Sequence, residues 1–144
     1  MDDWAYMQRA LDLARAQQGR TGTNPSVGCV IAKNGEIVGE GVTSEGGRPH
    51  GEANALQVAG RAAKGADVYV TLEPCSHYGQ TAPCANALIE AGIKRCFISV
   101  IDPDPRVHWR GAALLQEAGI DTRIGLGAEE AFQINMDFFA RVGG

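Results

Sequence analysis

The dipeptide Asn34-Gly35 lies between two stretches of apolar residues, and it restricts the fold more than any other local signal. Asn-Gly favours a two-residue hairpin turn, so 26–33 and 36–42 are predicted to be antiparallel strands. The following elements alternate: strands at 66–72, 95–101 and 121–125, and helices at 50–59, 83–91 and 111–118. A hairpin followed by strand–helix units predicts an α/β fold with a mixed sheet and helices on both faces.

A helix is also predicted at each end of the chain. The first could be capped by Asp2 or Asp3 and ends near Gly19. The last begins near Ala128, and we expect it to carry Phe132, Met136 and Phe139 on one face. This apolar last helix points to self-association as a homo-oligomer.

The composition fits one globular domain over residues 1–144, with 44% hydrophobic residues and a net charge of −4. Basic residues are scattered, which argues against nucleic acid as the main partner. No signal peptide and no membrane-spanning run is visible, so we expect a cytoplasmic protein without a membrane partner. Thiols stay reduced in the cytoplasm, which favours metal or catalytic sites over disulfides.

Two cysteines that each follow a proline, Cys75 and Cys84, are candidate metal ligands with eight residues between them. His50 is the best candidate for a third ligand, because it begins a predicted helix. Catalytic zinc takes three protein ligands, and the metal then lowers the pKa of a bound water. Glu52 follows two residues after His50 and could accept the proton of that water.

A closed structural zinc site is the main alternative, with His77 as a fourth ligand. Cys75 and His77 are separated by only one residue, a less usual spacing for such a site. The order His50-x-Glu52, then Pro-Cys75, then Cys84 is that of the zinc-deaminase signature, with a longer gap between the cysteines. A non-catalytic zinc-stabilised binding module therefore stays open beside an enzyme.

The chain resembles the deaminase domain of the bacterial bifunctional riboflavin-biosynthesis deaminase/reductase. The resemblance covers nearly the whole sequence and is carried by five segments: 23–30, 49–52, 69–84, 91–93 and 102–105. The loop Cys75-Ser-His-Tyr-Gly-Gln-Thr-Ala-Pro-Cys84 is the most distinctive of them. The resemblance implies a cytidine-deaminase-like, three-layer α/β/α fold with a five-stranded mixed sheet.

The resemblance also implies an activity. It is the hydrolysis of a cyclic amidine C–N bond in 2,5-diamino-6-(5-phosphoribosylamino)pyrimidin-4-one, a pyrimidine ribotide, with release of ammonia. Zn²⁺ would be held by His50, Cys75 and Cys84, with Glu52 as the proton shuttle. The alternative substrates are another nucleobase, a nucleoside or a tRNA base. Members of this family commonly continue into a reductase domain, which we expect to be absent here and either supplied elsewhere or cut away.

Substrate contacts are expected at Asn24, His77, Gln80 and Thr81. Asn24 could instead form a simple Asn-Pro turn, and Thr81 could cap a helix. Glu73 could orient the metal loop or be a solvated carboxylate. Two further cysteines, Cys29 and Cys96, lie in apolar strands and are expected to be buried.

Several positions depart from the family pattern. Gly51 replaces the usual alanine of His-Ala-Glu, Gln80 replaces a lysine or arginine, and Thr43 lies near the place of a usual histidine. His108-Trp109 replaces smaller residues, and Trp109 could cover the pocket or contact another subunit. Three arginines are candidate phosphate partners, although each could be an ordinary surface residue: Arg48, Arg106 and Arg110.

Overall fold

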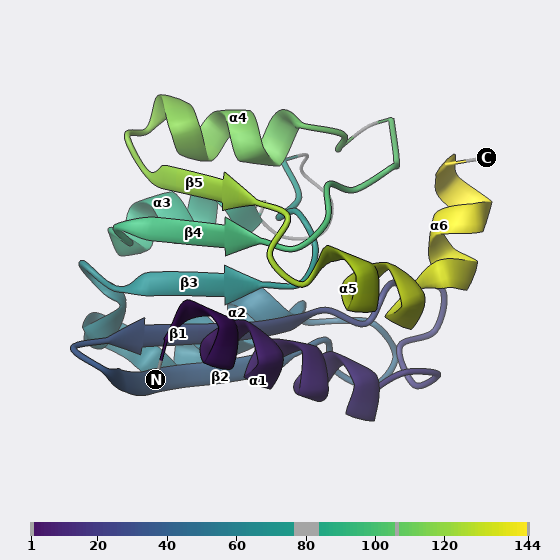
Figure 1. Ribbon diagram of the computed structural model, residues 1–144, viewed down its shortest axis with the longest axis horizontal. Helices are drawn as coiled ribbons and strands as arrows, with labels where there is room; N and C mark the ends of the chain where they lie inside the picture. The colour runs from purple at the N-terminus through teal and green to yellow at the C-terminus, as the bar shows by residue number, and fades with distance from the viewer. Residues whose placement is uncertain (1, 77–83, 106, 144) are drawn as a thin grey trace.

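A five-stranded mixed sheet with the strand order β2-β1-β3-β4-β5 forms the centre of the computed structural model, which describes residues 2–76, 84–105 and 107–143 (Figure 1). The strands are β1 (Gly28–Lys33), β2 (Glu36–Val42), β3 (Asp67–Val70), β4 (Arg95–Ile98) and β5 (Asp121–Ile124). β1 is antiparallel to both of its neighbours, whereas β3, β4 and β5 run parallel. The mixed sheet predicted from the sequence is therefore confirmed.

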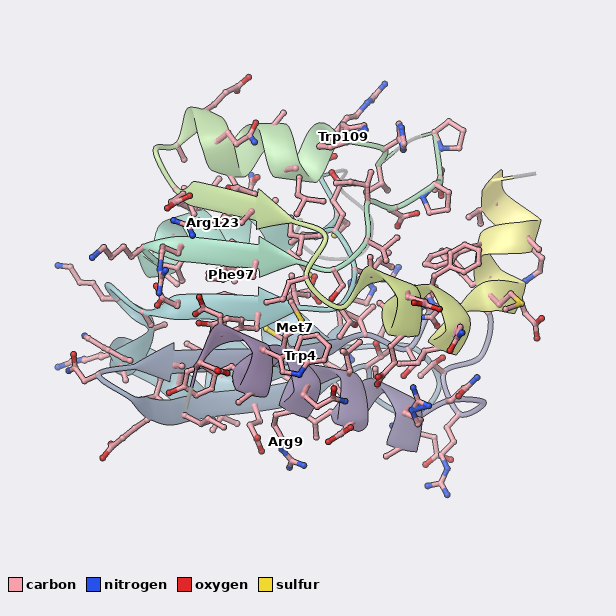
Figure 2. The ribbon with its side chains drawn as sticks, viewed as in Figure 1. Trp4, Met7, Arg9, Phe97, Trp109 and Arg123 are labelled. Carbon is pink, nitrogen blue, oxygen red and sulfur yellow. The ribbon has the colours of Figure 1, made fainter. Side chains whose placement is uncertain are left out.

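The helices cover both faces of the sheet. They are α1 (Asp3–Ala16), α2 (Gly51–Ala59), the short 3₁₀ helix η1 (Gly60–Ala63), α3 (Cys84–Ala91), α4 (Arg110–Glu117), α5 (Ala128–Ile134) and α6 (Met136–Gly143). α1 and α5 share an apolar cluster with Tyr69 and Phe97, and Met7 and Phe97 lie within this layer (Figure 2). Their strand neighbours Val68, Val70 and Cys96 point to the other face, where α2, α3 and α4 pack. Alternation along the strands thus produces three layers.

The hairpin between β1 and β2 forms at the predicted dipeptide. Asn34 and Gly35 have φ angles of 54° and 79°, and two successive positive φ values are the conformation that Asn-Gly favours. β1 begins at Gly28, two residues later than predicted. The backbone of Ser26 is instead bonded to the side chain of Asn135, which donates to its carbonyl (2.7 Å) and accepts from its N–H (2.8 Å).

The prediction of one continuous last helix is wrong. The helix ends at Ile134 and α6 begins at Met136, with Asn135 between them. Phe132 and Met136 are exposed and Phe139 is buried. The three side chains nevertheless lie around one hollow, as predicted, and the rings of Phe132 and Phe139 stack with centroids 5.2 Å apart. Asn135 leaves the helical path because its amide completes both hydrogen bonds to Ser26, a residue distant in sequence.

The sheet brings several loops together at one edge. Because β3 and β4 are parallel, the segments that follow them, 71–76 and 99–105, leave the sheet at the same end. This is the edge at which α/β proteins commonly bind ligands. α6 lies beyond this end of the sheet (Figure 1). In the part of the chain that the structure describes, no helix has the length and apolar character needed to span a membrane.

Candidate metal centre and its cavity

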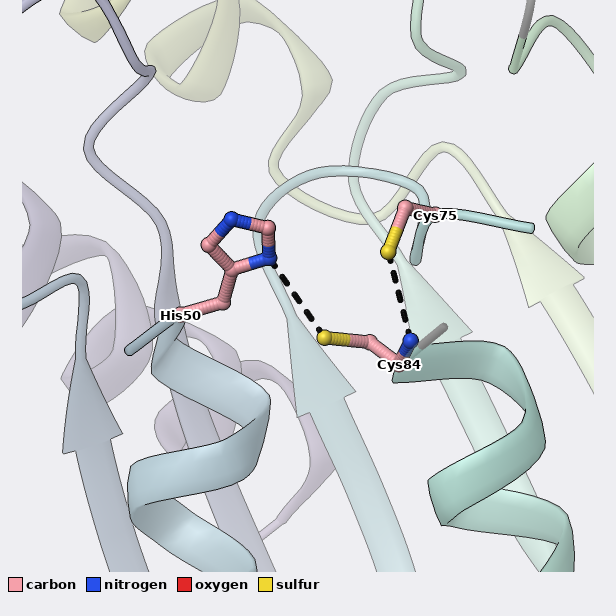
Figure 3. A group of neighbouring side chains, drawn as sticks. All are labelled: His50, Cys75 and Cys84. Carbon is pink, nitrogen blue, oxygen red and sulfur yellow. Dashed lines mark hydrogen bonds between the residues drawn. The ribbon is translucent and has the colours of Figure 1, made fainter. Parts of the chain in front are cut away.

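Three side chains from separate elements meet beside the end of β3: His50, Cys75 and Cys84 (Figure 3). His50 is the residue immediately before α2, and Cys84 is the first residue of α3. Cys75 lies in the segment after β3. Helix N-termini favour negative charge, and the backbone N–H at the start of α3 donates to Cys75 Sγ, so this helix end favours a thiolate at Cys75.

The spacing of these side chains fits a tetrahedral zinc ion. Their ligand atoms all lie within 4.8 Å of one another, and His50 Nδ1 is 3.5 Å from Cys84 Sγ. Zinc with a Zn–S distance of ~2.3 Å and a Zn–N distance of ~2.0 Å holds sulfur and nitrogen ligands about 3.5 Å apart. One imidazole and two thiols therefore form a donor set suited to zinc in both chemistry and separation. Among the described residues, the cluster contains these three ligands and no fourth.

The two thiols differ in their affinity for a proton in the absence of metal. A hydrogen bond from the Cys84 thiol, assisted by His50, lowers the pKa of Cys75 to about 4. The backbone N–H of Cys84 also donates to Cys75 Sγ, at 3.2 Å. The pKa of Cys84 is raised, first by its hydrogen bond to Cys75 and then by burial. One thiolate is thus already favoured before a metal binds.

Glu52 lies in the first turn of α2, two residues after His50, and its side chain lines the same cavity as His50 and Cys75. The residue is only 4% exposed. Burial raises the pKa of its carboxyl group to about 7, although the charge of His50 opposes this shift. A carboxyl group with this pKa can accept and release a proton near neutral pH.

A cavity of about 330 Å³ opens beside the three ligands, a volume suited to a small organic molecule. Its walls combine polar, acidic and apolar side chains. The polar and basic ones are Thr23, Asn24, Thr43 and Arg48; the carboxylates are Glu52, Glu73, Asp102 and Asp104; the apolar ones are Val27, Leu72, Val107, Phe138 and Val142.

Asn24 and Thr43 hold the loops of the polar wall. Asn24 Nδ2 donates to the carbonyl of Gly47 at 3.0 Å, which ties the Asn-Pro segment to the loop before His50. The hydroxyl of Thr43 donates to the Pro25 carbonyl (3.1 Å) and accepts from the Val27 N–H (2.9 Å). Asn24 therefore lines the cavity, as a substrate contact requires, and also has a structural partner.

Glu73 is buried, so the solvated alternative is wrong. Its carboxylate accepts from the backbone N–H groups of Asp102 and Trp109 (both 3.1 Å) and of Ala112 (2.9 Å). Glu73 thus fixes the segment between β4 and α4, which forms one side of the cavity. Burial nevertheless raises the pKa of this carboxyl group.

Other predicted contacts have different outcomes. Three of them, His77, Gln80 and Thr81, lie outside the described residues, as does Arg106. Arg110 and Trp109 are exposed and do not line the cavity. Trp109 lies beside the start of α4 (Figure 2). Cys29 and Cys96 are fully buried, as expected for cysteines in apolar strands.

Phe138 and Val142 also line the cavity, although neither was predicted from the sequence as a site residue. Both belong to α6, which places them on the apolar wall. Their four-residue spacing could have marked them as one helical face. However, the predicted continuous helix assigned the apolar face to other residues.

Comparisons with known proteins match the chain to a zinc-binding family, in agreement with the candidate metal ligands. Residues 1–100 match the family described as the cytidine and deoxycytidylate deaminase zinc-binding region. The chain is 54% identical over 142 residues to riboflavin biosynthesis protein RibD of Escherichia coli K12, covering 99% of this chain and 39% of that protein. It is 49% identical to a diaminohydroxyphosphoribosylamino-pyrimidine deaminase of Buchnera aphidicola, covering 99% of this chain and 97% of that protein.

A solved structure is similar to this chain over nearly its whole length. Acinetobacter baumannii RibD superposes with a TM-score of 0.94 at 43% identity, covering 98% of this chain and 40% of that one. The chain therefore spans about two fifths of the length of these RibD proteins. The cytidine-deaminase-like fold expected from the sequence is confirmed.

Proposed function

The chain belongs to the zinc-binding cytidine and deoxycytidylate deaminase family, and we propose that it is a hydrolytic deaminase of 2,5-diamino-6-(5-phosphoribosylamino)pyrimidin-4-one in riboflavin biosynthesis. The observation that carries this proposal is the meeting of His50, Cys75 and Cys84 beside a cavity that Glu52 also lines. The full-length match to a relative named for this deaminase supports the substrate. Residues 1–144 then form a single deaminase domain.

The reaction replaces the exocyclic amino group with oxygen from water and releases ammonia. His50, Cys75 and Cys84 would hold the zinc, which when bound supplies a Lewis acid that lowers the pKa of water. Glu52 takes one proton from the attacking water and delivers it to the ring nitrogen. It then takes the proton of the added hydroxyl and delivers it to the departing amino group, which leaves as ammonia. Its burial keeps this proton from exchanging freely with bulk water.

The chain's other residues position the ring. Asn24 keeps its side-chain oxygen available as an acceptor, since the bond to Gly47 uses only its amide N–H. The apolar wall, which includes Leu72 and Phe138, suits the faces of a pyrimidine. From the sequence, we propose His77, Gln80 and Thr81 as further substrate contacts.

Ammonia release from freshly prepared ribotide tests the proposal, with cytidine and guanine as competing substrates. Glu52→Gln should lower kcat by about 10²- to 10⁴-fold, because an amide cannot carry the proton, while one zinc per chain is retained. Glu129→Gln, an exposed glutamate on α5, is the matched control and should keep full activity. Unchanged turnover in Glu52→Gln would refute the shuttle, and turnover of cytidine or guanine but not of the ribotide would refute the substrate.

A further inference from the structure

Arg48 is a basic side chain at a cavity whose other charged walls are mainly acidic. It precedes His50 by two residues and is exposed. Among the described residues that line the cavity, it is the only lysine or arginine. The carboxylates of Glu52, Asp102 and Asp104 line the same space. Among the described lysines and arginines, Arg48 is therefore the one whose positive charge can attract an anionic group of a ligand in this cavity.

The loop that carries Arg48 is held in place from several sides. Gly47 N–H donates to the Ser44 carbonyl (2.9 Å), and Ser44 N–H donates to the Pro49 carbonyl (3.0 Å). Asn24 Nδ2 binds the Gly47 carbonyl, and a Cβ at Gly47 would lie only 2.5 Å from that nitrogen. Fixed backbone on both sides of Arg48 lowers the entropy lost when its guanidinium binds a ligand.

The guanidinium of Arg48 has no carboxylate partner among the residues that the structure describes, whereas several other arginines do. Arg9 pairs with Glu40, Arg15 with Glu130 and Arg95 with Asp67. Since none of the described carboxylates pairs with Arg48, its guanidinium donors are available for a ligand. Guanidinium groups match phosphate oxygens with two parallel hydrogen bonds.

We propose that Arg48 binds the phosphate of the ribotide and so orients its pyrimidine ring towards Glu52. The proposal rests on the proposed function, because it takes the substrate to be a phosphomonoester, which carries a charge of about −1.5 to −2 at pH 7. Gln80 supplies no charge, and the sequence from Cys75 to Cys84 contains no lysine or arginine. Arg48 supplies a positive charge from a different segment, the loop immediately before His50.

The test compares two substrates that differ only in the phosphate: the ribotide and its dephosphorylated riboside. Arg48→Ala should lower kcat/KM for the ribotide by about 10- to 100-fold, mainly through KM, and leave the riboside value within about twofold. Arg48→Lys should recover part of the loss, because it restores charge but not the paired hydrogen bonds. Arg61→Ala, at an exposed arginine on η1, is the matched control and should resemble the unaltered chain on both substrates.

A binding measurement separates this inference from the proposed function. Ribose 5-phosphate should bind the zinc-loaded chain, and calorimetry should show Kd raised by about tenfold or more in Arg48→Ala but not in Arg61→Ala. Ammonia release from the ribotide with no effect of Arg48→Ala, or with equal losses on ribotide and riboside, would overturn the role of Arg48 alone. Arg48-dependent binding of ribose 5-phosphate without ammonia release would overturn the proposed function alone.

Discussion

A single buried carboxylate, Glu73, determines how one side of the cavity is built. Its two oxygens accept three hydrogen bonds, from the backbone N–H groups of Asp102, Trp109 and Ala112. Gly111 allows this close arrangement, because a Cβ there would lie 1.9 Å from the Pro74 carbonyl oxygen. Glu73, two residues before Cys75, thus connects the segment that carries this candidate ligand to the loop that carries Asp102 and Asp104.

We expect Glu73→Gln to lower the free energy of unfolding by about 1–3 kcal/mol. The amide nitrogen of glutamine cannot accept a hydrogen bond, so at least one buried N–H loses its partner. Urea unfolding measures the change, and Glu36→Gln, an exposed glutamate on β2, is the control. KM for the ribotide should rise as the 102–109 segment loosens, while the zinc content stays at one ion per chain. Stability within 0.5 kcal/mol of the unaltered chain would show that the three hydrogen bonds contribute little.

The candidate metal ligands and the proton-accepting carboxylate could be predicted from the sequence, whereas the apolar residues that line the cavity could not. His50, Cys75, Cys84 and Glu52 stand out because few residue types bind zinc or move protons, and their order follows a known signature. The structure brings the three ligand side chains together. Phe138 is an ordinary apolar residue, and its place in the cavity depends on how α6 packs, which no local pattern specifies.

At the scale of elements, the sequence predicted the helices, strands and turns that depend on neighbouring residues. It did not predict the helix break that depends on a contact between distant residues. The Asn34-Gly35 turn and the alternation of strands and helices are local, and the structure has them. The break between α5 and α6 depends on Asn135, whose partner Ser26 is 109 positions away. A helical pattern through residues 128–139 carries no sign of such a bond.

The start of α2 leads to a prediction about Gly51. A Cβ at Gly51 would lie 2.3 Å from the Val27 carbonyl oxygen, closer than atoms can approach, so the helix packs against the chain entering β1 as only glycine permits. Gly51→Ala gains helix propensity of about 1 kcal/mol, but overpacking costs about 1–3 kcal/mol, so we expect a net loss of up to about 2 kcal/mol in the free energy of unfolding. The shift should also weaken zinc binding, because His50 immediately precedes this residue.

Chemical unfolding and competition with a zinc chelator measure these two effects. Val58→Ala is the matched control, since Val58 is on the same helix and 67% exposed; it should be neutral or slightly stabilising. If Gly51→Ala is instead stabilised by the amount that helix propensity predicts, α2 can move away from Val27 without cost, and the close packing inferred here is wrong.

At the scale of the whole molecule, the candidate metal site joins parts of the chain that the sheet alone does not connect. Its ligands come from the residue before α2, from the segment after β3 and from the first residue of α3. Zinc bound there would stabilise the folded chain, by about 2.7 kcal/mol when free zinc is 100 times its Kd. The four cysteines report separately on the site and on the core, because two are candidate ligands and two are buried in strands.

Removal of zinc should therefore expose the thiols in a fixed order. In the zinc-loaded chain we expect no rapid reaction of any cysteine with a thiol reagent at pH 7. After chelation Cys75 should react first, since its pKa is lowered to about 4 and it exists as a thiolate. Cys84 should follow more slowly, because its pKa is raised, and Cys29 and Cys96 should react only on unfolding, because they are fully buried.

Mass spectrometry of labelled peptides identifies each cysteine and separates three outcomes. Rapid labelling limited to Cys75 and Cys84 means that the metal holds the site while the core holds the fold. Rapid labelling of Cys29 and Cys96 as well means that the fold itself requires zinc, because these side chains lie among the apolar residues beneath α2 and α3. Labelling of Cys75 that is equally fast before and after chelation would show that this thiol does not bind the metal, and Cys75→Ser should then leave zinc content unchanged.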